Sequence, residues 1–317
     1  MKKQLLIAAV AATMTSVAIA DISITGGAKV NYENKDVQGA MTNTISHDVD
    51  FTVVGKNGGT AVSMTLATTE SGATDKGLAV EDTFLTTTIG DIAIKTGTWM
   101  SGDDMLNETS RANGKFEAST TFSGVKVAYF DYDSANESSQ SVKLSGSVAD
   151  VALSAEMGST FDTYTVDADV AGFGVSYKLR AQDAADEDKS SVMLTKDVSG
   201  VTLTYAQADA DTGVTLEGDS WLGDYEDGVS TTQILKVGDD VSGFGAKMAM
   251  AGNTVQVKRI TVDREGSVNK DIDYTKFYVT RPLASGATFE LTYTDADVDG
   301  STASDSETLD LELAVKF

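Results

Sequence analysis

The feature that most constrains the fold is a short turn signal that recurs between alternating segments. Each signal sets a small residue and a Gly or Asp between two apolar residues, as in Phe122-Ser123-Gly124-Val125. Gly, Asp and small residues tolerate the positive φ that two-residue hairpin turns demand. Related signals occupy 148–151, 170–173, 198–201 and 241–244. From Gly124 the next three follow in steps of 26, 22 and 28 residues, enough for two strands and a loop.

The pattern extends toward both ends of the chain. Short turns are also predicted at 56–59, 90–91 and 282–286, which makes eight in all. Longer polar links alternate with them, and these are 35–44, 71–77, 99–113, 209–228, 264–271 and 296–306. Short turns on one side and long loops on the other are typical of an outer-membrane barrel. With both termini on the turn side, eight turns predict 18 strands. This count takes 244–262 as one strand, which Gly252-Asn253 could bend; one turn fewer gives 16.

The predicted strands have one moderately apolar face and one polar face. After Gly124, Val125, Val127 and Tyr129 share one face, while Lys126 and Ala128 share the other. Side chains alternate across a strand with a period of two, so each segment presents two different surfaces. A soluble sandwich also alternates, with its polar residues outside. Many thin apolar faces around a polar interior instead suit lipid outside and water inside.

Both ends of the chain fit an exported protein. Residues 1–20 have the positive start, apolar stretch and small-x-small site of a cleaved secretory signal peptide, which leaves 21–317 as a single mature domain. No later segment is apolar enough for a spanning helix, so the mature chain would cross a membrane as strands. The last stretch, 307–317, alternates apolar and charged residues and closes on Phe317. Alone, that strand fits a membrane barrel and a soluble sandwich equally well.

Composition excludes several classes of function. Cysteine is absent and His47 is the one histidine, which argues against disulfides, thiolate metal sites and histidine clusters. Without the two lysines of the leader the formal charge is −26, the wrong sign for nucleic acid. Barrel enzymes generally need a histidine base, and His47 shares the apolar phase of its strand. No enzymatic activity and no cofactor are therefore expected.

Signal peptide, hairpin repeat, loop asymmetry and terminal Phe317 together make the mature chain resemble a Gram-negative general porin. The most similar segment is 89–98, which resembles the strand before the third, inward-folded loop of that family. The resemblance implies an all-β closed antiparallel barrel in the bacterial outer membrane, with 16 strands where the turn count gives 18. It also implies a homotrimer, contacts with outer-membrane lipid and lipopolysaccharide, and Phe317 as the signal for the barrel-assembly machinery.

The resemblance places the pore constriction in the link 99–113. Folded inward, this loop would present four charged side chains to the pore, which are Asp103, Asp104, Glu108 and Arg111. Strand parity nominates cations on the facing wall, which are Lys29, Lys95, Lys115, Lys126, Lys143, Lys178 and Arg180. Carboxylates facing cations across a narrow aqueous throat create a field that selects ions. The expected function is passive diffusion of ions and small hydrophilic solutes with a mild preference for cations.

Several alternatives stay open. The link 99–113 could instead be a solvated loop outside the pore, and a porin specific for one solute class is not excluded. Asp295, Asp297 and Asp299 open like a calcium loop, but Ser306 stands where that loop needs Glu, so they are weak metal candidates. The pair 221–222, Trp-Leu, would anchor its loop at the membrane interface or in a trimer contact. The main alternative function is a secreted acidic β-sandwich, a surface protein or adhesin without a pore.

Overall fold

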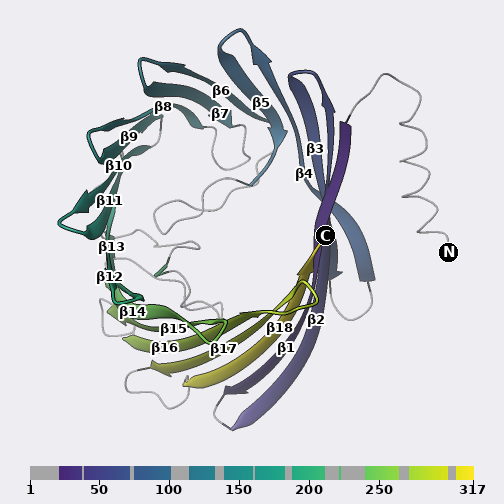
Figure 1. The fold of residues 1–317 in the computed structure, drawn as a ribbon, viewed down its shortest axis with the longest axis vertical. Coiled ribbons are helices and arrows are strands. Elements are labelled where there is room, and N and C mark those ends of the chain that lie inside the picture. Colours follow the sequence, from purple (N-terminus) through teal and green to yellow (C-terminus); the bar gives the residue numbers. More distant parts are fainter. Residues whose placement is uncertain are drawn as a thin grey trace, which may run out of the picture.

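The chain folds into a closed barrel of eighteen antiparallel strands (Figure 1). The computed structural model describes residues 21–37, 39–71, 75–100, 114–132, 139–159, 161–182, 188–210, 221–222, 240–263, 271–298 and 305–317. Within these residues, no helix is long and apolar enough to cross a membrane. The all-β closed barrel predicted from the alternation is confirmed, and a β-sandwich is excluded because the sheet has no open edge.

The strands follow one another around the ring in sequence order. They are β1 (Asp21–Val37), β2 (Ala40–Asn57), β3 (Thr60–Ser71), β4 (Asp75–Ile89), β5 (Ile92–Thr98), β6 (Lys115–Phe122), β7 (Val125–Tyr132), β8 (Ser139–Val148), β9 (Val151–Gly158), β10 (Phe161–Val170), β11 (Phe173–Gln182), β12 (Lys189–Val198), β13 (Val201–Ala210), β14 (Asp240–Met250), β15 (Asn253–Asp263), β16 (Ile272–Pro282), β17 (Ala287–Val298) and β18 (Ser306–Lys316). β1 pairs with both β2 and β18 and so closes the ring.

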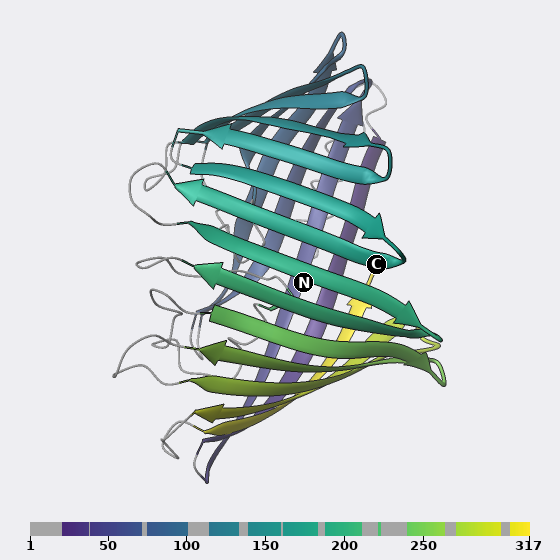
Figure 2. The ribbon, with the colours of Figure 1, turned by 90° about the vertical axis from the view of Figure 1, so that its left-hand side faces the viewer.

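Short turns gather at one end of the barrel, as predicted (Figure 2). Ser123 and Gly124 have φ of 51° and 83°, the paired positive values that suit a tight hairpin. One predicted turn is wrong. Residues 241–244 lie within β14, and the chain turns at Ala251 and Gly252 instead, with φ of 51° and 78°. The stretch 244–262 is therefore two strands. The count of 18 is confirmed, whereas the 16 strands of the general-porin resemblance are not found.

The link predicted at 35–44 is also wrong. β1 runs to Val37 and β2 starts at Ala40, so this hairpin is short although it lies on the loop side. The carboxylate of Asp36 accepts a hydrogen bond from the Gly39 N–H at 2.6 Å, which closes the turn. Below it, the amide oxygen of Asn43 accepts hydrogen bonds from both Tyr32 and Asn34. These polar contacts between β1 and β2 stabilise the hairpin through residues 35–44, although that stretch is as polar as a loop.

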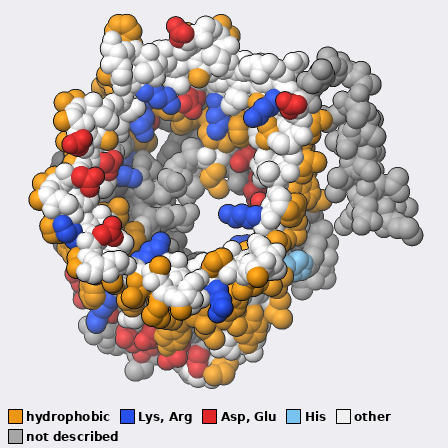
Figure 3. All heavy atoms as spheres, in the orientation of Figure 1, with side chains coloured by type: hydrophobic (Ala, Val, Ile, Leu, Met, Phe, Trp, Pro, Cys, Tyr) orange, Lys and Arg blue, Asp and Glu red, His pale blue; other side chains and the backbone are white. Residues whose placement is uncertain are grey.

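The strand register sorts side chains into an outward face and a face toward the interior of the barrel, the lumen. Large apolar side chains remain exposed around the outside, among them Ile24, Ile45, Phe122 and Phe244. Figure 3 shows hydrophobic side chains around the rim and Lys and Arg side chains in the opening. His47 pairs with Val30 on the outward face, in agreement with the apolar phase of its strand. Exposed apolar residues on a barrel wall are what lipid contact requires.

The chain end completes the barrel. The N–H of Gly26 donates to the carbonyl oxygen of Phe317 at 2.8 Å, and the Phe317 N–H donates back at 2.9 Å. The Phe317 ring lies over Gly26, where a Cβ would stand 2.5 Å from the Asp50 carbonyl oxygen and 2.9 Å from the tip of the ring. Phe317 therefore extends the β1–β18 ladder, and the close approach of β2 and of the ring leaves room only for glycine at position 26.

The fold predicts a specific backbone weakness at Gly97. This residue has a φ of 136°, and a Cβ there would collide with the carbonyl oxygen of Thr83 on β4. We expect Gly97→Ala to destabilise the barrel by about 1–3 kcal/mol, because the backbone must leave a conformation that L side chains rarely adopt. The measurement is the temperature at which the folded band converts to the unfolded band on a gel.

Gly55→Ala is the matched control, since nothing lies within 4 Å of a Cβ at Gly55. Equal conversion temperatures for the two variants would contradict the argument.

Candidate functional site

Many of the charged side chains of the barrel wall face the lumen. All seven cations nominated by strand parity, Lys29, Lys95, Lys115, Lys126, Lys143, Lys178 and Arg180, lie on strand positions that face it. The register links them into a continuous inner surface: Lys95 pairs with Glu117 across β5 and β6, and Lys143 with Glu156 across β8 and β9. On β11, the Arg180 guanidinium lies 3.7 Å from the centre of the Phe161 ring. The cations thus line the wall from β5 to β11, with Lys29 apart on β1.

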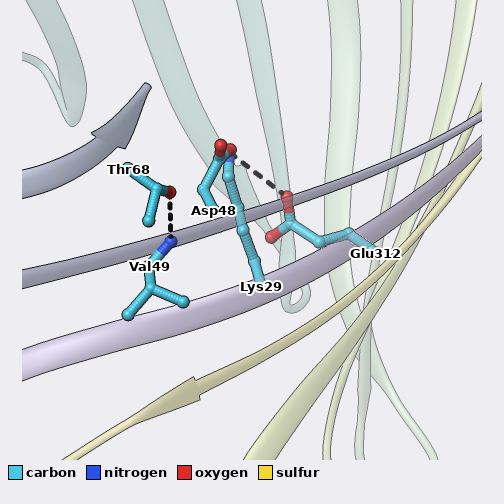
Figure 4. Close-up of polar contacts among 5 residues, drawn as sticks. All are labelled: Lys29, Asp48, Val49, Thr68 and Glu312. Carbon is cyan, nitrogen blue, oxygen red and sulfur yellow. Dashed lines mark hydrogen bonds and ion pairs between the residues drawn. The ribbon is translucent and has the colours of Figure 1, made fainter. Parts of the chain in front are cut away.

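Lys29 joins the two strands that flank the closure of the barrel. Its ammonium nitrogen lies 3.4 Å from an Asp48 oxygen on β2 and 3.7 Å from a Glu312 oxygen on β18 (Figure 4). The side chains of Lys29 and Asp48 are 47% and 45% exposed, so water screens their attraction and its effect on stability is small. The arrangement sets one cation between two carboxylates on the inner wall, where it shapes the local field.

Close to Lys29 and Asp48, a side chain replaces a backbone partner at the point where the ladder between β2 and β3 ends. The last paired residues of β2 and β3 are Asp50 and Ala67, and the ladder of β3 with β4 shifts at Thr65 and Leu66. The N–H of Val49 then donates to the Thr68 hydroxyl at 3.0 Å (Figure 4). A backbone donor that loses its strand partner is satisfied in this way.

Two further ion pairs lie on the wall formed by β6 to β9. Lys126 stands 3.6 Å from Glu117, and Lys143 stands 3.6 Å from Glu156. The Ser141 hydroxyl also donates to Glu156 at 2.7 Å, which orients that carboxylate. The wall therefore carries alternating charges rather than cations alone.

An aromatic cluster encloses two lysines at the start of the predicted constriction loop. The Lys95 ammonium lies 4.2 Å from the ring centres of both Phe84 and Trp99. Lys115 is fully buried, and its ammonium lies 5.6 Å from the centre of Trp99 and 5.1 Å from that of Tyr132. Cations attract the faces of aromatic rings most strongly where water is excluded. Trp99, the first residue of the link 99–113, is therefore buried on the lumen side of the wall.

The charged residues predicted within that link, Asp103, Asp104, Glu108 and Arg111, lie outside the described residues. The other predicted sites are placed as follows. Phe317 closes the ladder of β1, as described above. Asp295 and Asp297 lie on the outward face of β17, where Asp295 pairs with Glu307, and Asp299 lies outside the described residues. In the part of the chain that the structure describes, no group of three acidic or histidine side chains is arranged to hold a metal ion.

Sequence reasoning missed the acidic part of the lumen. It drew its carboxylates from the loop, whereas Asp48, Glu117, Glu156 and Glu312 come from the wall itself. It also missed three buried cations on inward positions, which are Lys189, Lys258 and Lys276. Alternation of side chains along the strands was used to select the inward lysines. The same alternation would have identified the inward carboxylates, because every side chain of a strand follows the period of two.

The position of Trp221 and Leu222 corrects another expectation. They lie neither at the membrane interface nor on the outer wall, but on the inner wall against β14 and β15. Leu222 is buried within an apolar cluster, and Trp221 packs against the same cluster. Two residues of the link between β13 and β14 are therefore inside the barrel.

Comparison with known proteins places this fold among outer-membrane barrels. No family model and no curated protein matches the sequence. The structure is similar to Pseudomonas aeruginosa OccK2 (OpdF), with a TM-score of 0.71, 9% identity and coverage of 94% of this chain and 98% of that chain. The outer membrane protein OpdK of the same species matches with a TM-score of 0.70 and 10% identity, at 94% and 98% coverage. Acinetobacter baumannii OccAB4 matches with a TM-score of 0.66 and 11% identity, at the same coverage.

At these identities the likeness establishes the architecture. The fold is that of a Gram-negative outer-membrane β-barrel with eighteen strands, matched over nearly the full length of both chains. It is a larger ring than the resemblance to general porins implied, and that part of the expectation is corrected.

The aromatic cluster supports a prediction about stability. Trp99 is almost fully buried between Phe84 and Tyr132, with ring centres 6.2 Å and 6.3 Å away. We expect Trp99→Ala to lower the free energy of unfolding by about 3–5 kcal/mol, because it leaves a cavity and uncovers two cations. Trp99→Phe keeps a ring in place and should cost much less. The measurement is the gel conversion temperature, and an unchanged value for Trp99→Ala would refute the packing argument.

Proposed function

We propose that this chain is a channel in the Gram-negative outer membrane, through which ions and small hydrophilic solutes diffuse passively. The observation that carries the proposal is the charged inner surface of a closed barrel whose outer surface is apolar. Among outer-membrane barrels, a polar interior lines an aqueous channel, while the apolar band faces lipid. No bond is made or broken in transport. The width of the pore and the electric field inside it decide which solutes cross.

The proposal includes mild cation preference and a constriction formed by the link 99–113. Support comes from the burial of Trp99 on the lumen wall, at the first residue of that link. Asp103, Asp104 and Glu108 would then face the cations of the wall. The wall carboxylates Asp48 and Glu312 add to the same preference.

The proposal also carries the features that accompany such a channel. Residues 1–20 would be the cleaved signal peptide and 21–317 the barrel domain. Phe317 would serve as the signal for the barrel-assembly machinery, consistent with its role in the final ladder. The chain would assemble as a homotrimer surrounded by lipid and lipopolysaccharide.

A second candidate is a channel that favours a class of aromatic acids. OpdK, whose fold is similar, has also been solved with vanillate. In the present chain, Lys95 and Lys115 lie against the rings of Phe84, Trp99 and Tyr132, so cations and aromatic surfaces occur together on one wall. An aromatic carboxylate would match both. Vanillate blocking the open channel would favour this candidate, and an unchanged current at millimolar vanillate would favour general diffusion.

Planar-bilayer recording of the refolded mature chain tests the proposal. We expect discrete conductance steps and a reversal potential of cation-preferring sign in a salt gradient, because carboxylates raise the local concentration of cations. The triple variant Asp103→Asn, Asp104→Asn, Glu108→Gln should lower the cation preference. A barrel that inserts without conducting, or one that prefers anions, would refute the corresponding part of the proposal.

Lys29 offers a second, local test of selectivity. We expect Lys29→Met to raise cation preference, because it leaves the carboxylates of Asp48 and Glu312 on the lumen wall without the cation between them. Asp48→Asn should shift the reversal potential the other way. Lys196→Met is the control, since Lys196 takes an outward position and donates to the carbonyl of Ala171. A shift for the control as large as that for Lys29→Met would contradict this assignment.

A further inference from the structure

We propose that Trp221 and Leu222 are a fixed anchor on the inner wall, which narrows the lumen from the β13–β17 side and confines solutes to its charged side. The inference deepens the proposed function and rests on it. It concerns these two described residues, which lie between the end of β13 and the start of β14.

The wall is shaped to receive the tryptophan ring. Gly243 and Gly245 stand on the inward face of β14, two residues apart. A Cβ at Gly243 would lie 3.0 Å from both the Trp221 ring and the Arg259 carbonyl oxygen and 3.1 Å from Leu222, and one at Gly245 would lie 2.8 Å from the Trp221 ring and 2.7 Å from the Val257 carbonyl oxygen. Any larger residue at either position would therefore press on the anchor. Glycine weakens a strand, so two in close succession mark a place where something must approach the backbone closely.

Lys258 on β15 holds the same residue by its backbone. Its ammonium donates to the Trp221 carbonyl oxygen at 3.3 Å. The same nitrogen lies 5.0 Å from the centre of the Trp221 ring and 5.4 Å from that of Tyr278. Lys258 is buried, so water competes little for this hydrogen bond. Ring and backbone of one residue are thus both engaged by the wall.

The surrounding surface is apolar although it faces the lumen. Its buried members on inward positions are Ala206, Ala208, Val241, Ile260, Val262, Ile272, Tyr274, Ala296 and Val298. The interior of an outer-membrane channel is polar, so an apolar sector on this scale would be unfavourable in contact with water. Leu222 belongs to this cluster and Trp221 packs against it. Because their removal would expose the cluster to water, we expect both residues to stay bound to the wall.

The consequence is an off-centre pore. The apolar cluster that receives Trp221 and Leu222 lies on β13 to β17, whereas the ion pairs described above lie on β1, β2, β18 and β6 to β9. Solutes would pass along this charged part of the wall. Trp221 and Leu222 would then limit the size of the solute, while Lys29, Lys126, Lys143 and their carboxylates act on its charge.

Fluorescence tests the seat independently of conduction. The chain has two tryptophans, so the variant Trp99→Phe leaves Trp221 as the single reporter. We expect blue-shifted emission that acrylamide quenches several-fold less than free tryptophan. Adding Gly243→Val should expel the ring, shift the emission to the red and restore quenching. Gly158→Val is the matched control, because a Cβ there meets the Phe161 carbonyl oxygen, as one at Gly243 meets that of Arg259, but it does not meet Trp221 or Leu222. Strong quenching of Trp221 before Gly243→Val is added would overturn the proposal.

Single-channel recording tests the narrowing. Trp221→Ala with Leu222→Ala should raise conductance by about half, because current follows the open cross-section. Gly243→Val should raise it similarly and add little in the double-alanine background, since both act through one contact. Unchanged conductance in the double-alanine variant, or full additivity, would overturn the anchor. The double-alanine variant alters no strand, so it stays informative if Gly243→Val fails to fold. A wild-type barrel that inserts without conducting would refute the proposed function, while Trp221 emission still separates a seated anchor from a loose loop.

Discussion

The constraint on which the structure depends is the pairing of every strand edge. A sheet in contact with lipid cannot leave N–H and C=O groups unpaired, so it must close on itself. β1 achieves this by pairing along its length with β2 and, from Gly27 onward, with β18. Phe317 extends the second ladder by one further pair, to Gly26. The ladder that closes the barrel thus includes Phe317, in line with the regular alternation of β18.

Closure also creates the lumen, and the lumen explains a charge pattern that composition alone leaves ambiguous. A chain of strong negative charge could be a soluble acidic protein. Here the wall pairs Lys126 with Glu117 and Lys143 with Glu156, and it places Lys29 between two carboxylates. Half-exposed pairs of this kind contribute little to stability. Their arrangement therefore says little about the stability of the barrel. It is more informative about an aqueous pore, in which fixed charges of both signs act on passing ions.

The sequence predicted the class of fold because the period of two is carried by many strands at once. It predicted the inward position of seven cations for the same reason, since parity survives an error of a few residues in a strand boundary. It failed where local chemistry imitates another element. The stretch 35–44 is polar enough for a loop, yet Asn43, Tyr32 and Asn34 hydrogen bond across a hairpin. Nothing in a single sequence distinguishes the two, because the partner strand decides.

The misplaced turn at 241–244 and the misassigned Trp221 have one cause. Val241, Ser242, Gly243 and Phe244 match the turn signal, because a glycine that permits a turn cannot be told from a glycine that makes room for a ring. In the structure Gly243 faces the lumen and Trp221 lies against it. On β15 and β16 the inward residues Ile260 and Ile272 are apolar, whereas Arg259 and Asp273 on the outward face are polar and form an ion pair, so the alternation is reversed where the anchor packs. A sector of barrel wall in which the apolar residues turn inward is therefore itself a signal, because water in the lumen would not favour them: it indicates that part of the chain covers the wall from inside.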